Sequence, residues 1–182
     1  LDRFERAGLP VPDTLFTNDP DAVRAFADRH DRVVYKPVSR GAPPSELDAD
    51  DLSTDRLDTL GAAPVQFQEL VEGEDLRVYV LDGEVVGATR YESAGDSFSF
   101  RVDQYEDEDV SLSAATVPSD VADTVRRAAD AIDVTFAAAD VVCGSEGDHA
   151  LLELNQAPGF AAADELADQG IADALADHLL DA

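Results

Sequence analysis

Asp82-Gly83 is the feature of this sequence that most restricts its fold. The dipeptide separates two alternating apolar runs, Leu76–Leu81 and Glu84–Tyr91. Asp-Gly between such runs favours the two-residue turn of a β-hairpin, because both turn residues need a positive φ. The two runs are therefore predicted to be neighbouring antiparallel strands.

Other segments extend this pattern. Further strands are predicted at 33–37, 65–71 and 97–105, and a second hairpin is predicted to pair 138–143 with 150–155. Helices are predicted to end near residue 8, to begin at Pro20, and to cover 54–60, 118–132 and 163–180. Strands that pair mainly antiparallel, with helices on one side, are typical of an α+β fold.

The charge of the chain narrows its partners. It carries 40 acidic residues against 13 basic ones, a formal net charge of −27, while 45% of its residues are hydrophobic. The hydrophobic content argues for a folded protein, and the acidic surface makes nucleic acid and anionic membranes poor partners. Scattered acid with almost no lysine indicates a halophilic origin, in which salt screens the repulsion; an ordinary acidic protein is the alternative.

Several further features bear on where the protein works. Cys143 is the only cysteine, which excludes a disulfide framework, and its valine neighbours indicate a buried thiol. No apolar run approaches membrane-spanning length and no signal peptide is visible, so we expect a cytoplasmic protein. The chain begins without an initiator methionine and is expected to be part of something longer.

Lys36 is the only lysine of the chain, and it ends an apolar, β-branched run just before Pro37 and a loop of small residues. Lysine presents a compact ammonium that acts as a point charge on a phosphate. A strand that delivers it into such a loop favours a nucleotide site. The alternative is a strand-end lysine that reaches to solvent.

The second hairpin carries the other polar group of interest. Asp140 lies on one strand, and Glu153 and Asn155 lie two residues apart on its partner, so alternation points the last two to the same face. Two carboxylates and an amide oxygen form a set of hard ligands that suits Mg²⁺ or Mn²⁺. The alternative is a strand with one solvated face in an acid-rich protein.

Taken in order along the chain, these segments resemble the ATP-grasp superfamily, and within it the RimK-like glutamate ligases and the glutathione synthetases. The resemblance is carried by Tyr35-Lys36-Pro37, by the run from Gln68-Glu69-Leu70-Val71 through Asp75 and Arg77, by Asp140, and by Glu153-Leu154-Asn155 with Gln156-Ala157-Pro158-Gly159. It covers essentially the whole chain.

The resemblance implies an ATP-grasp fold, in which two α+β lobes with mainly antiparallel sheets close on ATP. Residues 1–71 would form the small lobe with a lead-in helix, and residues 72–182 the large lobe with the metal site. The implied activity is an ATP- and Mg²⁺-dependent ligation, which joins a small-molecule carboxylate to a small-molecule amine through an acylphosphate. Relatives carry a preceding α/β domain, so an N-terminal domain is expected to be missing here.

The resemblance also implies residue roles. Lys36 would bind the α- and β-phosphates, and Asp75 would accept from the ribose hydroxyls. Arg77 and Arg90, on paired strands, would face phosphate or the acylphosphate. The lobe-linking segment that meets adenine would be Gln68, Glu69, Leu70 and Val71, and the metal ligands would be Asp140, Glu153 and Asn155.

Two departures from the family leave other functions open. Residues 39–45 hold one glycine and two prolines where relatives carry a glycine-rich lid, and Asp103 stands where relatives often have asparagine. A nucleotide-binding but catalytically weak regulatory domain is therefore one alternative to an active ligase. A salt-adapted interaction module, with Asp140, Glu153 and Asn155 as plain surface residues, is the other.

Overall fold

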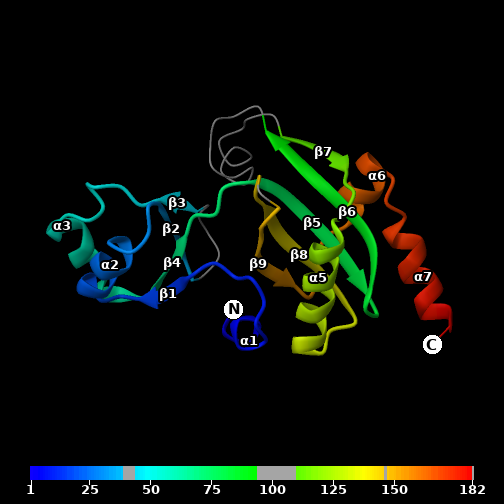
Figure 1. Cartoon of the computed structure of the whole chain (residues 1–182), viewed down its shortest axis with the longest axis horizontal. Coiled ribbons are helices and arrows are strands. Elements are labelled where there is room, and N and C mark those ends of the chain that lie inside the picture. The colour runs from blue at the N-terminus through cyan, green and yellow to red at the C-terminus, as the bar shows by residue number, and fades with distance from the viewer. Residues whose placement is uncertain (39–43, 94–109, 146, 182) are drawn as a thin grey trace. The chain divides into compact units, whose positions relative to one another are not determined.

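The computed structural model describes residues 1–38, 44–93, 110–145 and 147–181. They form two compact units, Pro12–Val71 and the combination of Leu1–Val11 with Glu72–Ala182. Each unit holds one antiparallel sheet with helices beside it (Figure 1), which confirms the predicted α+β class. No helix in the described part of the chain is long and apolar enough to cross a membrane.

The lead-in segment differs from its expected placement in a lobe of residues 1–71. Helix α1 (Asp2–Arg6) belongs to the larger unit, not to the smaller one. Its Phe4, together with Leu9, is buried in the core of that unit, and the Leu151 N–H donates to the Pro10 carbonyl oxygen at 2.7 Å. Burial of apolar surface decides the grouping here, since sequence order alone would attach the helix to the strands that follow it.

The smaller unit is a four-stranded sheet in the order β1-β4-β2-β3. Its strands are β1 (Thr14–Thr17), β4 (Val65–Glu69), β2 (Val33–Pro37) and β3 (Ser45–Glu46). The other elements are helix α2 (Pro20–Ala27), helix α3 (Thr54–Leu57) and the 3₁₀ turn η1 (Asp58–Ala62). The core consists of Val23, Phe26, Val33, Leu57 and Phe67.

Helix α2 follows from its local sequence. The Asp19 side chain accepts a hydrogen bond from the Asp21 N–H at 3.0 Å, and Pro20 occupies the first turn, where no N–H partner is needed. Val23 and Phe26, three residues apart, then fall on the buried face.

The larger unit is a five-stranded sheet in the order β7-β6-β5-β8-β9, with every pair antiparallel. Its strands are β5 (Glu74–Leu81), β6 (Glu84–Ser93), β7 (Val110–Ala114), β8 (Phe136–Cys143) and β9 (His149–Asn155). Asp82 and Gly83 have φ values of 48° and 77° in the turn between β5 and β6, which confirms the predicted hairpin.

Helices cover both faces of this sheet (Figure 1). Helix α5 (Ser119–Ile132) packs Val121, Val125 and Ala128 against one face, where Val78 and Ala139 belong to the same core. On the other face, Tyr79 and Ala138 pack with helices α6 (Ala161–Ala167) and α7 (Ile171–Asp181). The rest of that second face carries the polar residues considered below.

Three secondary-structure predictions need correction or fall outside the described residues. The single closing helix over 163–180 was wrong, because the chain forms α6 and α7 separated by Asp168 (φ 50°) and Gly170 (φ 69°). The Asp164 carboxylate accepts from the N–H groups of Ile171 and Ala172 and so begins the second helix. Strands β1 and β7 were not predicted, β3 lies in a predicted loop, and most of the strand predicted at 97–105 lies with residues 94–109, outside the described residues.

Candidate functional site

Three of the predicted site residues lie side by side on the second face of the larger sheet. Arg77 on β5 is paired with Asp140 on β8, and Asp140 is paired in turn with Glu153 on β9. Directly paired residues of antiparallel strands point to the same face. The register therefore places one guanidinium and two carboxylates in a row across three strands.

Arg77 and Asp140 form a largely buried ion pair. The Arg77 Nη1 donates to Asp140 Oδ1 at 3.1 Å, and the two side chains are 13% and 9% exposed. Burial by itself lowers the pKa of the Arg77 guanidinium, but the charge of Asp140, with smaller contributions from Tyr91 and Tyr79, raises it, and the net shift is upward. The guanidinium thus stays fully charged in a poorly solvated place.

Glu153 and Asn155 supply the remaining oxygen ligands of the predicted metal site. Asn155 ends β9, and its Oδ1 accepts from the Ala157 N–H at 3.0 Å, which leaves the second lone pair of that oxygen for a ligand. Within the described residues no three His, Cys, Asp or Glu side chains form a metal-binding group. The donor set therefore consists of two adjacent carboxylates and one amide oxygen, a composition that fits Mg²⁺ when phosphate oxygens complete its shell.

Arg90 is not brought to this group. It is paired with Leu76, whose side chain lies in the core beneath α5, so Arg90 points to the first face of the sheet and Arg77 to the second. Its Nε lies 2.7 Å from the Glu74 carboxylate, a residue on the same face. Position 89, not 90, faces Arg77 across the β5–β6 pair, and it is a fully buried threonine.

Asp75 and Tyr79 share the face of Arg77 because each lies two residues away on β5. Asp75 is half-buried, and its predicted contact with ribose stays a prediction. The sequence analysis missed Tyr79, whose hydroxyl donates to the Gly159 carbonyl oxygen at 3.2 Å and whose ring lies 5.9 Å from the Arg77 guanidinium carbon. Its spacing from Arg77 was the available signal.

In the smaller unit, Lys36 is half-buried and is paired with Gln66 of β4. Val33, Tyr35 and Phe67 pack with the core beneath α2, so Lys36 and Gln66 point to the opposite face. Gln66 is buried and was not predicted as a site residue. An amide beside the only lysine adds a hydrogen-bonding group to this face.

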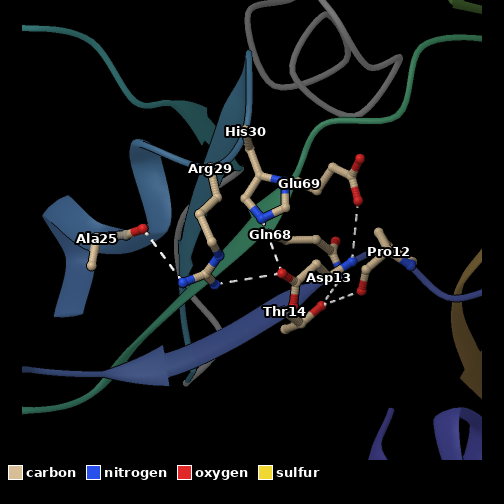
Figure 2. A network of polar contacts seen from close by, with 8 residues as sticks. All are labelled: Pro12, Asp13, Thr14, Ala25, Arg29, His30, Gln68 and Glu69. Carbon is tan, nitrogen blue, oxygen red and sulfur yellow. Dashed lines mark hydrogen bonds and ion pairs between the residues drawn. The ribbon is translucent and has the colours of Figure 1, made fainter.

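The predicted adenine segment, Gln68 to Val71, begins in β4 and runs to the end of the smaller unit. The Glu69 N–H donates to the Asp13 carbonyl oxygen at 2.9 Å, and the Leu70 N–H donates to the Arg32 carbonyl oxygen at 3.0 Å. The buried Gln68 side chain donates to the Thr14 hydroxyl at 2.8 Å (Figure 2). Two amides of the segment are therefore used within the unit.

A family model described as an ATP-grasp domain, family 2 of its clade, matches residues 22–173 of the chain. No curated protein matches the sequence.

Solved structures of ligases match nearly the whole chain. The ATP-grasp ligase PsnB complexed with minimal precursor is 37% identical, with a TM-score of 0.88, and the match covers 99% of this chain and 58% of that one. PsnB complexed with minimal precursor, Mg and ADP is 37% identical, with a TM-score of 0.85, over 98% of this chain and 55% of that one. A RiPP-associated ATP-grasp ligase of Chryseobacterium gregarium, in complex with ADP and a leader and core peptide, is 25% identical, with a TM-score of 0.83, over 99% of this chain and 57% of that one.

The chain thus spans somewhat more than half the length of each of these structures. The likeness extends over both sheets, since nearly all of the chain is covered.

Proposed function

The chain belongs to the ATP-grasp family, and we propose that it is the nucleotide-binding part of a ligase that activates a peptide carboxylate with ATP and joins it to an amine. The predicted ATP-grasp fold is confirmed. The narrower RimK-like assignment, the halophilic origin and the cytoplasmic location stay predictions from the sequence.

One observation carries the proposal: Arg77, Asp140 and Glu153 lie in a row on one face of the larger sheet of a chain with this fold. A carboxylate that attacks the γ-phosphate gives an acylphosphate, and the amine then displaces phosphate to form an amide. Such a reaction asks the protein for positioning and for neutralisation of negative charge. A desolvated guanidinium beside two carboxylates suits that task.

Each residue has a role in the proposal. Asp140, Glu153 and Asn155 would hold magnesium, which when bound neutralises the phosphate oxygens. Arg77 would keep Asp140 oriented and stabilise the negative charge that develops on the transferred phosphoryl group. Lys36 would bind the phosphates, and Val71 would supply the backbone N–H that adenine accepts from, because the amides of Glu69 and Leu70 are already engaged.

The substrate class in the proposal differs from the one expected from the sequence, a small-molecule acid and a small-molecule amine. PsnB and the Chryseobacterium ligase are complexed with peptides. We therefore assign the reacting carboxylate to an acidic side chain of a peptide. The amine would come from the same peptide or from a second substrate.

The first test is nucleotide binding by the chain in concentrated salt, measured by titration calorimetry with ADP and Mg²⁺. Wild type is expected to bind. Lys36→Ala should abolish the binding, and Glu153→Gln should weaken its dependence on magnesium while the melting temperature without nucleotide stays unchanged. Matched controls are Arg6→Ala and Glu84→Gln, whose side chains are 78% and 80% exposed; both should bind as wild type does.

The second test is turnover. ADP release from ATP should depend on a peptide with acidic side chains and should fall when the carboxylates are replaced by amides. Nucleotide binding without such release would overturn the ligase assignment in favour of the regulatory domain. That alternative was motivated by residues 39–45, of which 39–43 lie outside the described residues, and by Asp103, which also lies outside them.

A further inference from the structure

Asp13 lies where the chain enters the smaller unit, and Glu69 lies where the chain is about to leave it. The two residues are held together through their backbones at the end of the β1–β4 pair, where the Glu69 N–H donates to the Asp13 carbonyl oxygen at 2.9 Å. The Asp13 N–H donates back to Glu69 Oε2 at 3.3 Å. The strand that carries the proposed adenine segment is thus clamped to residue 13.

The Asp13 side chain extends this clamp to helix α2 and the residues after it. Its Oδ2 accepts from His30 Nε2 at 3.0 Å and forms an ion pair with Arg29 Nη2 at 3.6 Å (Figure 2). A carboxylate can only accept, so His30 Nε2 is the donor in this contact. Two acidic side chains meet at this point, Asp13 and Glu69, and the basic pair offsets their repulsion.

The basic pair is itself fixed to the core. The His30 side chain is only 14% exposed, and its ring centroid lies 4.6 Å from that of Phe26, which is 1% exposed. The Arg29 guanidinium carbon lies 5.3 Å from the Phe26 ring centroid, and its Nη1 donates to the Ala25 carbonyl oxygen at 3.4 Å. The position of Asp13 is therefore referred to the most buried part of the unit.

A second chain of hydrogen bonds runs beside the first. Gln68 Nε2 donates to Thr14 Oγ1 at 2.8 Å, and Thr14 Oγ1 donates to the Pro12 carbonyl oxygen at 2.9 Å (Figure 2). Residues 12–14 and 68–69 are consequently joined by side chains as well as by the sheet.

From these contacts we propose that Asp13 is a positioning residue for the adenine-binding segment, acting through Glu69 and held by His30 and Arg29. The inference rests on the proposed function, since it assigns a purpose to the rigid placement of Glu69 to Val71. Asp13 does not touch the nucleotide. Its loss would free the end of β4 and so misplace the Val71 N–H, while the phosphate-binding groups would keep their geometry.

The test compares two ligands that differ in the base: ADP with Mg²⁺ and inorganic triphosphate with Mg²⁺. Asp13→Ala is expected to weaken ADP binding by about threefold to tenfold, the range for loss of one or two hydrogen bonds. Affinity for inorganic triphosphate should stay within about twofold of wild type. Asp13→Asn keeps an acceptor for His30 and should recover most of the ADP affinity, and Asp31→Ala, at an exposed aspartate close by, should change neither.

The outcomes separate the two proposals. If wild type fails to bind ADP, the proposed function is overturned and this inference with it. If wild type binds ADP but Asp13→Ala binds both ligands normally, or loses both equally, only the positioning role is overturned. Should Asp13→Ala not fold, Asp13→Asn and His30→Ala give the same comparison, with His30→Ala expected to lose ADP affinity selectively.

Discussion

Asp140 and Glu153 face each other across the β8–β9 pair, one position before the register shifts between Asp140 and Val141. Beyond the shift, Val141 is paired with Leu151, so Leu152 is an extra residue in β9. Leu151 and Val141 lie in the core beneath α5, whereas Asp140 lies on the other face. The bulge therefore lets a core leucine and a site glutamate two residues apart point to opposite faces, which regular alternation forbids.

This arrangement predicts the effect of removing the extra residue. Deletion of Leu152 would restore regular pairing and force either Glu153 into the core or Leu151 out of it. We expect a loss of more than about 3 kcal/mol in the free energy of unfolding, because a carboxylate would be buried without a partner. Urea unfolding measures the loss; Leu152→Ala, which keeps the chain length, should cost about 1 kcal/mol, and equal losses would contradict the role of the bulge.

The ion pair of Arg77 and Asp140 predicts a second effect on stability. Asp140→Asn removes one charge and leaves the guanidinium largely buried without its compensation. We expect about 3 kcal/mol of destabilisation, since breaking a buried pair is costly even where forming it gains little. The measurement is the urea midpoint at neutral pH. An unchanged midpoint would mean that solvent reaches Arg77 freely.

Gly73 makes a close approach to β8. A Cβ at this position would overlap the carbonyl oxygen of Cys143, whereas a Cβ at Gly61 would meet nothing within 4 Å. Gly73→Ala should therefore lower the free energy of unfolding by more than about 2 kcal/mol. Gly61→Ala is the control and should change it by less than about 1 kcal/mol. Similar melting temperatures for the two variants would contradict the packing.

Glu46 predicts a pH-dependent term. Arg32 donates to its two carboxylate oxygens, each at 2.7 Å, and these hydrogen bonds hold the pKa of Glu46 below its ordinary value of 4.5. A lowered folded-state pKa adds stability above pH 4.5 that is lost as the pH falls through the lowered value. Both side chains are partly exposed, so Glu46→Gln should cost only about 0.5 kcal/mol at pH 7.

The check is the stability difference between wild type and Glu46→Gln, measured by urea unfolding at several pH values. The difference should shrink as the pH falls below 4.5. A difference that grows on acidification would contradict the assignment.

Cys143 is predicted to react slowly. Burial, followed by the charges of Glu74 and Asp120, raises the pKa of its thiol, so less thiolate is present at mildly alkaline pH. Alkylation by iodoacetamide at pH 8.5 should be at least about tenfold slower in the folded chain than in urea. Equal rates would show that the thiol is accessible and ionised. The expectation of a buried, unreactive thiol came from its valine neighbours.

Local sequence was sufficient wherever a few adjacent residues set the conformation. Asp82-Gly83 supplies the positive φ values that its turn needs, and Asp19-Pro20 starts α2 with a side-chain acceptor and a residue that needs no partner. The spacing of Glu153 and Asn155 likewise placed both on one face, since both lie beyond the bulge.

Only the tertiary structure decided which face and which unit a residue joined. Arg90 turns away from Arg77 because its register with Leu76 is set by packing between strands, and α1 joins the larger unit because Phe4 finds its apolar partners there. The break before α7 depends on Asp164, seven residues from the N–H it caps. Backbone conformation is encoded over a few residues, whereas register, bulges and burial depend on contacts between distant segments, which periodicity within one segment does not contain.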